Sequence, residues 1–116
     1  MTTVVIEIKS VEQAHREIVE MLERGGADAT PRIGFVSYEL FYKILSPNRM
    51  AIIRAMTGAG PLSIRDVARR VERDFKGVHT DVTALLNNGL LHKTDDGKVE
   101  FPYEDIHFDF RLSSAA

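Results

Sequence analysis

The sequence predicts an α+β fold. Two short helical patterns joined by a tight turn occupy residues 63–88, and an Asp-Gly turn between two short apolar runs follows them directly. Apolar and polar residues alternate with the period of a β-strand near both ends of the chain. This order is typical of a winged helix-turn-helix (residues 46–103), with an N-terminal strand-helix extension (1–45) and a C-terminal strand and tail (104–116).

The composition is that of one ordinary domain with a hydrophobic core. The chain has 116 residues, of which 44% are hydrophobic and 28% charged, and its net charge is −2. It has no cysteine, which excludes disulfides, thiolate metal sites and cysteine nucleophiles. No apolar run is long enough to cross a bilayer and the first residues lack a signal-peptide pattern, so we expect a cytoplasmic protein without a membrane partner.

The first 26 residues predict a strand followed by a helix. Thr3–Lys9 alternates in a way that fits a strand with one buried face. Ser10, with Gln13 three positions later, is typical of a helix N-cap, and Gly25-Gly26 ends the apolar helical repeat that follows.

Residues 27–45 predict a turn, a second strand and a short helix. The turn covers Ala27–Pro31, and Ile33, Phe35 and Ser37 alternate as residues of a strand do. The aromatic-rich segment Tyr38–Leu45 is interpreted as a helix packed against the core, although a strand also fits a segment of this length.

Three further helices are predicted over residues 46–88. Each follows a residue whose side chain can accept a hydrogen bond from the first free amides of a helix. Ser46 is predicted to cap a helix from Pro47 to about Thr57. Ser63 is predicted to cap the helix that contains Ile64, Val67 and Val71, and Asp74 is predicted to cap Phe75–Asn88.

The last of these helices has an apolar side and a polar side. At 100° per residue, the apolar side gathers Phe75, Val78, Val82, Leu85 and Leu86. The opposite side gathers Lys76, Thr80, Thr83 and Asn87, with His79 at its edge. Hydroxyl, amide and amine groups can bond base edges or phosphates, so this side is predicted to enter the major groove of double-stranded DNA.

Positive charge concentrates around these helices. Residues 46–101 hold nine Lys or Arg against seven Asp or Glu, whereas acidic residues predominate on either side. A solvated arginine face is an ordinary alternative when such a cluster stands alone. Asp81 would repel phosphate if it were free, so it is interpreted as the partner of an arginine from the preceding helix.

The wing is predicted as a hairpin of two strands, Leu90–Thr94 and Lys98–Pro102. Asp95 and Asp96 at its tip argue against insertion into the minor groove, and Lys98 is the better candidate for a phosphate contact. The complete set of predicted DNA-binding residues is Ser63, Arg65, Arg69, Arg73, Lys76, His79, Thr80, Thr83 and Lys98.

The C-terminal strand has the cleanest alternation in the chain. Its four apolar positions, which are predicted to be buried, are Ile106, Phe108, Phe110 and Leu112. Such a strand either joins the N-terminal strand in a second layer or across a two-fold axis, or completes the sheet of its own monomer. The first arrangement leads to a homodimer that presents two reading helices to a pseudo-palindromic site. Residues 113–116 are predicted to be a frayed tail.

The helical and wing segments resemble the MarR-like winged-helix family of predicted prokaryotic transcriptional regulators over residues 35–112. The motifs that carry the resemblance are Pro47 and Arg49, Ser63-Ile64-Arg65, Val78-His79 with Asp81-Val82, Asn88-Gly89-Leu90 and Pro102-Tyr103. The resemblance implies a DNA-binding repressor, or the antitoxin of a toxin–antitoxin pair with a toxin as protein partner. Gly77 and Thr80 depart from the family pattern, which puts the strength of DNA binding in question.

No enzymatic function is expected. The four histidines fall on different predicted elements without carboxylates at metal-ligand spacing, and the chain has neither a phosphate loop nor a nucleophile elbow. We therefore expect no metal, cofactor or catalytic residue. The alternative to DNA binding is a protein-interaction module in which a terminal strand pairs with a partner by edge addition.

Overall fold

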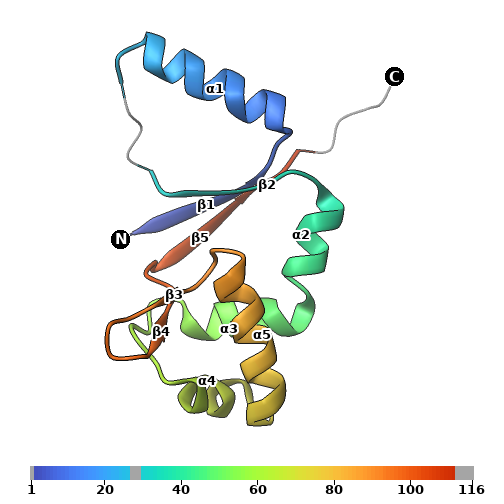
Figure 1. Cartoon of the computed structure of the whole chain (residues 1–116), viewed down its shortest axis with the longest axis vertical. Helices are drawn as coiled ribbons and strands as arrows, with labels where there is room; N and C mark the ends of the chain where they lie inside the picture. Colours follow the sequence, from blue (N-terminus) through green and yellow to red (C-terminus); the bar gives the residue numbers. More distant parts are fainter. Residues whose placement is uncertain (1, 27–29, 112–116) are drawn as a thin grey trace.

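A computed structural model describes residues 2–26 and 30–111 of the chain (Figure 1). In chain order its elements are β1 (Thr3–Ile8), α1 (Val11–Glu23), β2 (Arg32–Phe35), α2 (Tyr38–Ile44), α3 (Pro47–Met56), α4 (Ile64–Val71), α5 (Phe75–Asn87), β3 (His92–Lys93), β4 (Val99–Glu100) and β5 (Asp105–Asp109). The predicted α+β class is confirmed. Leu112 and the predicted tail at 113–116 lie outside the described residues, as does most of the predicted turn at Ala27–Pro31.

The helices begin at the predicted caps. The side chains of Ser10, Ser46, Ser63 and Asp74 each accept a hydrogen bond from the backbone amide three positions later, which satisfies one of the free donors of the first turn. Ser37 was predicted to continue the second strand, and that prediction is wrong. Its hydroxyl instead accepts from the amide of Leu40 and caps α2. None of the helices in the described part of the chain is long and apolar enough to cross a bilayer.

The N-terminal and C-terminal strands meet in one parallel sheet. Its order is β2-β1-β5, with Ile33 and Ile106 flanking the central strand opposite Ile6 and Val4. The C-terminal strand therefore joins the N-terminal strand within a single chain, as Figure 1 shows. The strand thus joins the N-terminal strand in a layer separate from the β3–β4 hairpin, which was one of the arrangements left open by the sequence, and the pairing lies within one chain.

The central strand is buried on both faces, so the prediction of a single buried face is wrong. Val5 and Glu7, on the face opposite Val4, are as enclosed as the core residues. Glu7 is only 6% exposed, and it forms ion pairs with Lys9 and, at 2.6 Å, with Arg32. Although burial by itself lowers the pKa of Lys9, hydrogen bonds to Glu17 and Glu7 outweigh it and raise that pKa. These partners allow a carboxylate to lie on a buried face.

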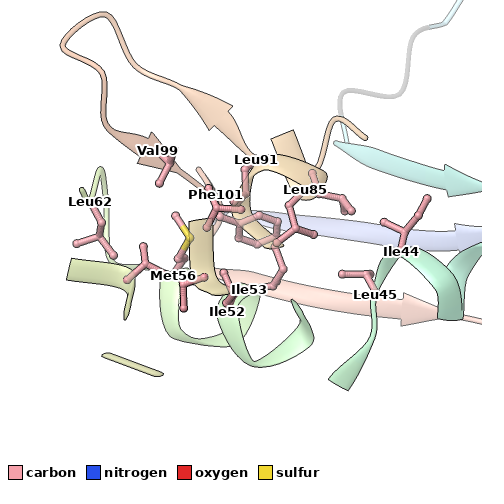
Figure 2. Packing of buried hydrophobic residues seen from close by; sticks show 14 of the residues in the cluster. Ile44, Leu45, Ile52, Ile53, Met56, Leu62, Leu85, Leu91, Val99 and Phe101 are labelled. Atoms are coloured by element: carbon pink, nitrogen blue, oxygen red, sulfur yellow. The ribbon is translucent and has the colours of Figure 1, made fainter. Parts of the chain in front are cut away.

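The hydrophobic core lies between the other face of the sheet and the helices α2 to α5. Val4 and Ile6 from β1 belong to the same cluster as apolar side chains of α3, α5 and the hairpin. Figure 2 shows this packing from close by, with Phe101 next to Leu85 and Leu91. The core therefore fixes the side of α5 that points inward.

The predicted hairpin is present but shorter than expected. Only two residues of each strand pair, because Leu90 and Leu91 turn into the core and the amide of Leu90 bonds the carbonyl of Leu85 at 2.9 Å. A β-bridge between Leu62 and Val99 adds a third segment beside β4.

The described apolar side chains of the C-terminal strand are less buried than predicted. Phe108 is 40% exposed, and Ile106 and Phe110 are only half-buried. The reason is that β5 lies at the margin of the sheet, where Phe41 of α2 covers only part of its apolar face. The ring centroids of Phe108 and Phe110 lie 6.3 Å and 4.7 Å from that of Phe41.

Helix α1 stands apart from the rest of the molecule. It has no buried residue, and Val11, Ile18 and Leu22 on its apolar stripe are each more than half exposed. A groove of about 1170 Å³ separates α1 from the sheet. In Figure 1, α1 lies at the end of the molecule opposite to α4 and α5.

Candidate nucleic-acid interface

The polar side of α5 is exposed along its whole length. We call this surface the α5 outer face, and its residues are Lys76, His79, Thr80, Thr83 and Asn87. On the opposite side of the helix Val78, Val82 and Leu85 are at 0% exposure. The rotation of α5 is therefore set by its buried side, and the five polar residues point away from the core as predicted.

The two threonines of the α5 outer face are oriented within the helix. The Thr80 hydroxyl donates to the carbonyl of Lys76 at 3.1 Å, and the Thr83 hydroxyl donates to the carbonyl of His79 at 2.8 Å. A hydroxyl that donates its hydrogen still has acceptor lone pairs. Both threonines can therefore accept a hydrogen bond from a donor outside the helix.

Phe75 was assigned to the core, and the structure places it at the surface instead. Its side chain is 41% exposed, and the guanidinium of Arg65 lies 4.7 Å from its ring centroid. Phe75 is the first residue of α5, one turn before the helix meets the core at Val78. The contact is a cation–π interaction that holds Arg65 of α4 against the start of α5.

Three arginines surround the start of α5. Arg65, Arg69 and Arg73 line a surface hollow of about 480 Å³ together with Phe75 and Glu72. Arg69 is exposed and forms an ion pair with Asp66 one turn earlier on α4. Three of the predicted phosphate contacts are thus brought together, with the carboxylates of Glu72 and Asp66 among them.

Asp81 lies between two arginines. Its Oδ2 accepts from Nη1 of Arg73 at 2.8 Å, and its Oδ1 accepts from Nε of Arg49 at 3.0 Å. The prediction of an arginine partner from the preceding helix is corrected in two respects. Arg73 follows α4 by two residues instead of belonging to it, and Arg49 comes from α3. The charge of Asp81 is thereby offset, and Arg73 has a structural partner.

Sequence reasoning missed the role of Arg49, which no local pattern indicates. Its guanidinium also donates to the carbonyls of Lys43 and Ile44, both at 3.4 Å, at the C-terminal end of α2. Arg49 thus connects α2, α3 and α5, and it helps to fix the position of the α5 outer face.

The turn between α4 and α5 contains a backbone conformation that favours glycine. Glu72 has φ of 55° and ψ of 48°, which is the left-handed region. We expect Glu72→Gly to raise the free energy of unfolding by about 0.5 to 1 kcal/mol, because relief of roughly 1 to 2 kcal/mol of steric cost exceeds the loss from a more flexible unfolded chain.

Urea denaturation measures this change. Arg54→Gly, at an exposed position inside α3, is the control and should lower the free energy of unfolding by about 1 kcal/mol. A decrease in the Glu72→Gly variant would contradict the assignment of strain to Glu72.

The hairpin presents a mixed charge. Nζ of Lys98 lies 4.0 Å from Oδ2 of Asp96. The Thr94 hydroxyl donates to the Asp96 carboxylate and lowers its pKa, so this carboxylate is ionised at neutral pH. The side chain of Lys98 is half exposed, and the carboxylate beside it offsets part of the positive charge that a phosphate would meet.

The remaining predicted residue, Ser63, is engaged in folding. Its hydroxyl accepts from the amide of Asp66 at 3.1 Å and caps α4. Over the part of the chain that the structure describes, no three His, Asp or Glu side chains come together as a metal site.

Comparison with known proteins gives one family. The model of the HVO_A0114 family matches residues 44–108, which is more than half of the chain and includes α3 to α5, the hairpin and most of β5. No curated protein matches the chain. The extent of the family match shows that this chain belongs to the HVO_A0114 family.

Proposed function

We propose that the protein is a winged helix-turn-helix transcriptional regulator that binds double-stranded DNA with the α5 outer face in the major groove. The observation that carries the proposal is the exposure of five polar or basic residues on one side of a helix whose other side is locked into the core. No carboxylate interrupts this face, since Asp81 is held by Arg49 and Arg73. A helix of this kind suits the groove and the negative potential of DNA.

The order of elements around α5 supports the same function. Helix α4 precedes it through a short turn, and the β3–β4 hairpin follows it at once. In winged helix-turn-helix proteins the second helix reads the groove and the hairpin contacts the adjacent backbone. The resemblance to MarR-like regulators implies a repressor.

The proposed contacts fall into two groups. Base edges would be read by Lys76, His79, Thr80 and Thr83, with Lys76 as the residue best suited to guanine. Phosphates would be bound by the exposed cations Arg65 and Arg69 and by Lys98 of the hairpin. Arg73 is better regarded as the partner of Asp81 than as a phosphate contact.

Binding to the duplex upstream of the protein's own gene, measured by fluorescence anisotropy at several salt concentrations, tests the proposal. Four cations on phosphates or bases predict a slope of about −3 to −4 for log affinity against log salt per protomer. Binding of that duplex should also be at least about 1000-fold tighter than binding of an unrelated duplex. Absence of binding at low salt would contradict the proposal.

A further inference from the structure

The free margin of the parallel sheet is long and unusually exposed. Among the described strands, β5 pairs only with β1, so its second edge carries unpaired backbone groups. Asp105, His107, Phe108 and Asp109 are all exposed. We infer that this edge pairs with the β5 edge of a second copy of the chain, antiparallel and centred on Phe108, to form a continuous sheet of six strands.

The charges along β5 match a second copy in this register. In an antiparallel pair centred on Phe108, Asp105 lies opposite Arg111 of the second copy, and His107 lies opposite Asp109. Both pairs occur twice because the arrangement has two-fold symmetry. Asp105 and Arg111 carry opposite charges, which stabilise a pair that faces each other across two strands, and the His107 ring can donate a hydrogen bond to Asp109.

Neighbouring registers are disfavoured by the same charges. A pair centred on His107 sets Asp105 opposite Asp109 on both sides of the axis. A pair centred on Asp109 sets this carboxylate against its own counterpart in the second copy. Registers centred between two residues would place apolar side chains opposite polar ones, which the two-residue period of a strand excludes.

The apolar side chains agree with the register as well. Ile106 would lie opposite Phe110 of the second copy, and Phe108 would lie opposite its own counterpart. The rings of Phe108 and Phe110 both contact Phe41, so the alternation of faces continues past the last residue of β5. The Tyr38 hydroxyl donates to the carbonyl of Arg111 at 3.2 Å, which holds the backbone in place where the charge pair would form.

The other margin of the sheet is less suited to pairing. Strand β2 has four residues with Gly34 inside it, and it follows Pro31, which has no backbone donor. The partner inferred for β5 goes beyond the DNA-binding proposal and does not depend on it. It would supply the two-fold axis that a regulator with two reading helices requires.

Exchange of the charged pair tests the inference without DNA. Sedimentation equilibrium over a concentration series should give a dimer for the natural chain. Arg111→Asp places two carboxylates opposite each other across the two copies, and Asp105→Arg places two guanidinium groups opposite each other. Because like charges repel, each single variant should be monomeric over the same range. The double variant with both exchanges restores opposite charges and should regain the dimer.

Three results would contradict the inference. A natural chain that is monomeric at all concentrations, or single variants that dimerise as well as the natural chain, would overturn the inference. Leu22→Asp on the exposed stripe of α1 is the matched control, and it should leave the dimer intact. A dimer lost only in Leu22→Asp would assign the interface to α1 instead.

Disulfide cross-linking tests the register separately. The chain has no cysteine, so a single introduced thiol reports its own position. Phe108→Cys should form an intermolecular disulfide under mild oxidation, because two residues directly opposite on the axis lie within the 4.4 to 6.8 Å or so that a disulfide spans between Cα atoms. His107→Cys should cross-link far less, and preferential cross-linking at 107 would overturn the register. Circular dichroism of each variant before oxidation shows whether it is folded.

Discussion

Asp81→Ala is expected to lower the free energy of unfolding by about 2 to 3 kcal/mol. The carboxylate is only 14% exposed and accepts hydrogen bonds from Arg49 and Arg73. Its removal leaves two partly buried guanidinium groups without their shared acceptor. The expected loss is below the roughly 3 to 5 kcal/mol of a fully buried pair, because the arginine side chains are 23% and 26% exposed.

The loss should be measured by urea denaturation followed by far-UV circular dichroism. Asp66→Ala is the matched control, since it removes a carboxylate that pairs with Arg69, a side chain 77% exposed at the surface. That variant should lose at most about 1 kcal/mol. Equal losses in the two variants would show that Asp81 does not connect α3 to α5 as inferred.

Local signals in the sequence predicted the helices well. Ser10, Ser46, Ser63 and Asp74 each precede a helix because the capping hydrogen bond is made within four residues. The error at Ser37 also has a local cause. Ser37 continues the alternation of Ile33 and Phe35, but its hydroxyl can equally cap the helix that follows, and the sequence alone does not distinguish the two. The polar face of α5 also follows from the period of a helix and the apolar residues on its other side.

Contacts between distant segments could not be predicted from the sequence. The position of a strand in a sheet depends on which other strands it meets, so the alternation in β5 could not reveal that Phe108 would be 40% exposed at a margin. Likewise, the charge of Asp81 indicated an arginine partner. It could not indicate Arg49, because Arg49 is 32 residues away along the chain and no local pattern joins the two. Phe75 falls in the helical repeat of the core residues of α5, but it packs under Arg65 at the surface. The reason is that α5 first meets the core one turn later, at Val78.

Replacing both Lys76 and Thr80 with alanine is expected to weaken binding to the upstream duplex roughly tenfold to a hundredfold, since a specific base contact contributes about 1 to 3 kcal/mol. Both side chains are exposed, and alanine is a good helix former, so the fold should be retained. The salt dependence of the residual binding should fall by about one unit of slope, because one cation is removed.

The most direct test of the α5 outer face compares this double variant with Arg16→Ala under identical salt. Arg16 is an exposed cation on α1, at the opposite end of the molecule, so its removal changes the net charge without touching α5. We predict that the affinity for the upstream duplex falls only in the Lys76→Ala/Thr80→Ala variant. Equal affinity of that variant and the natural chain would contradict the assignment of α5 as the DNA-reading helix.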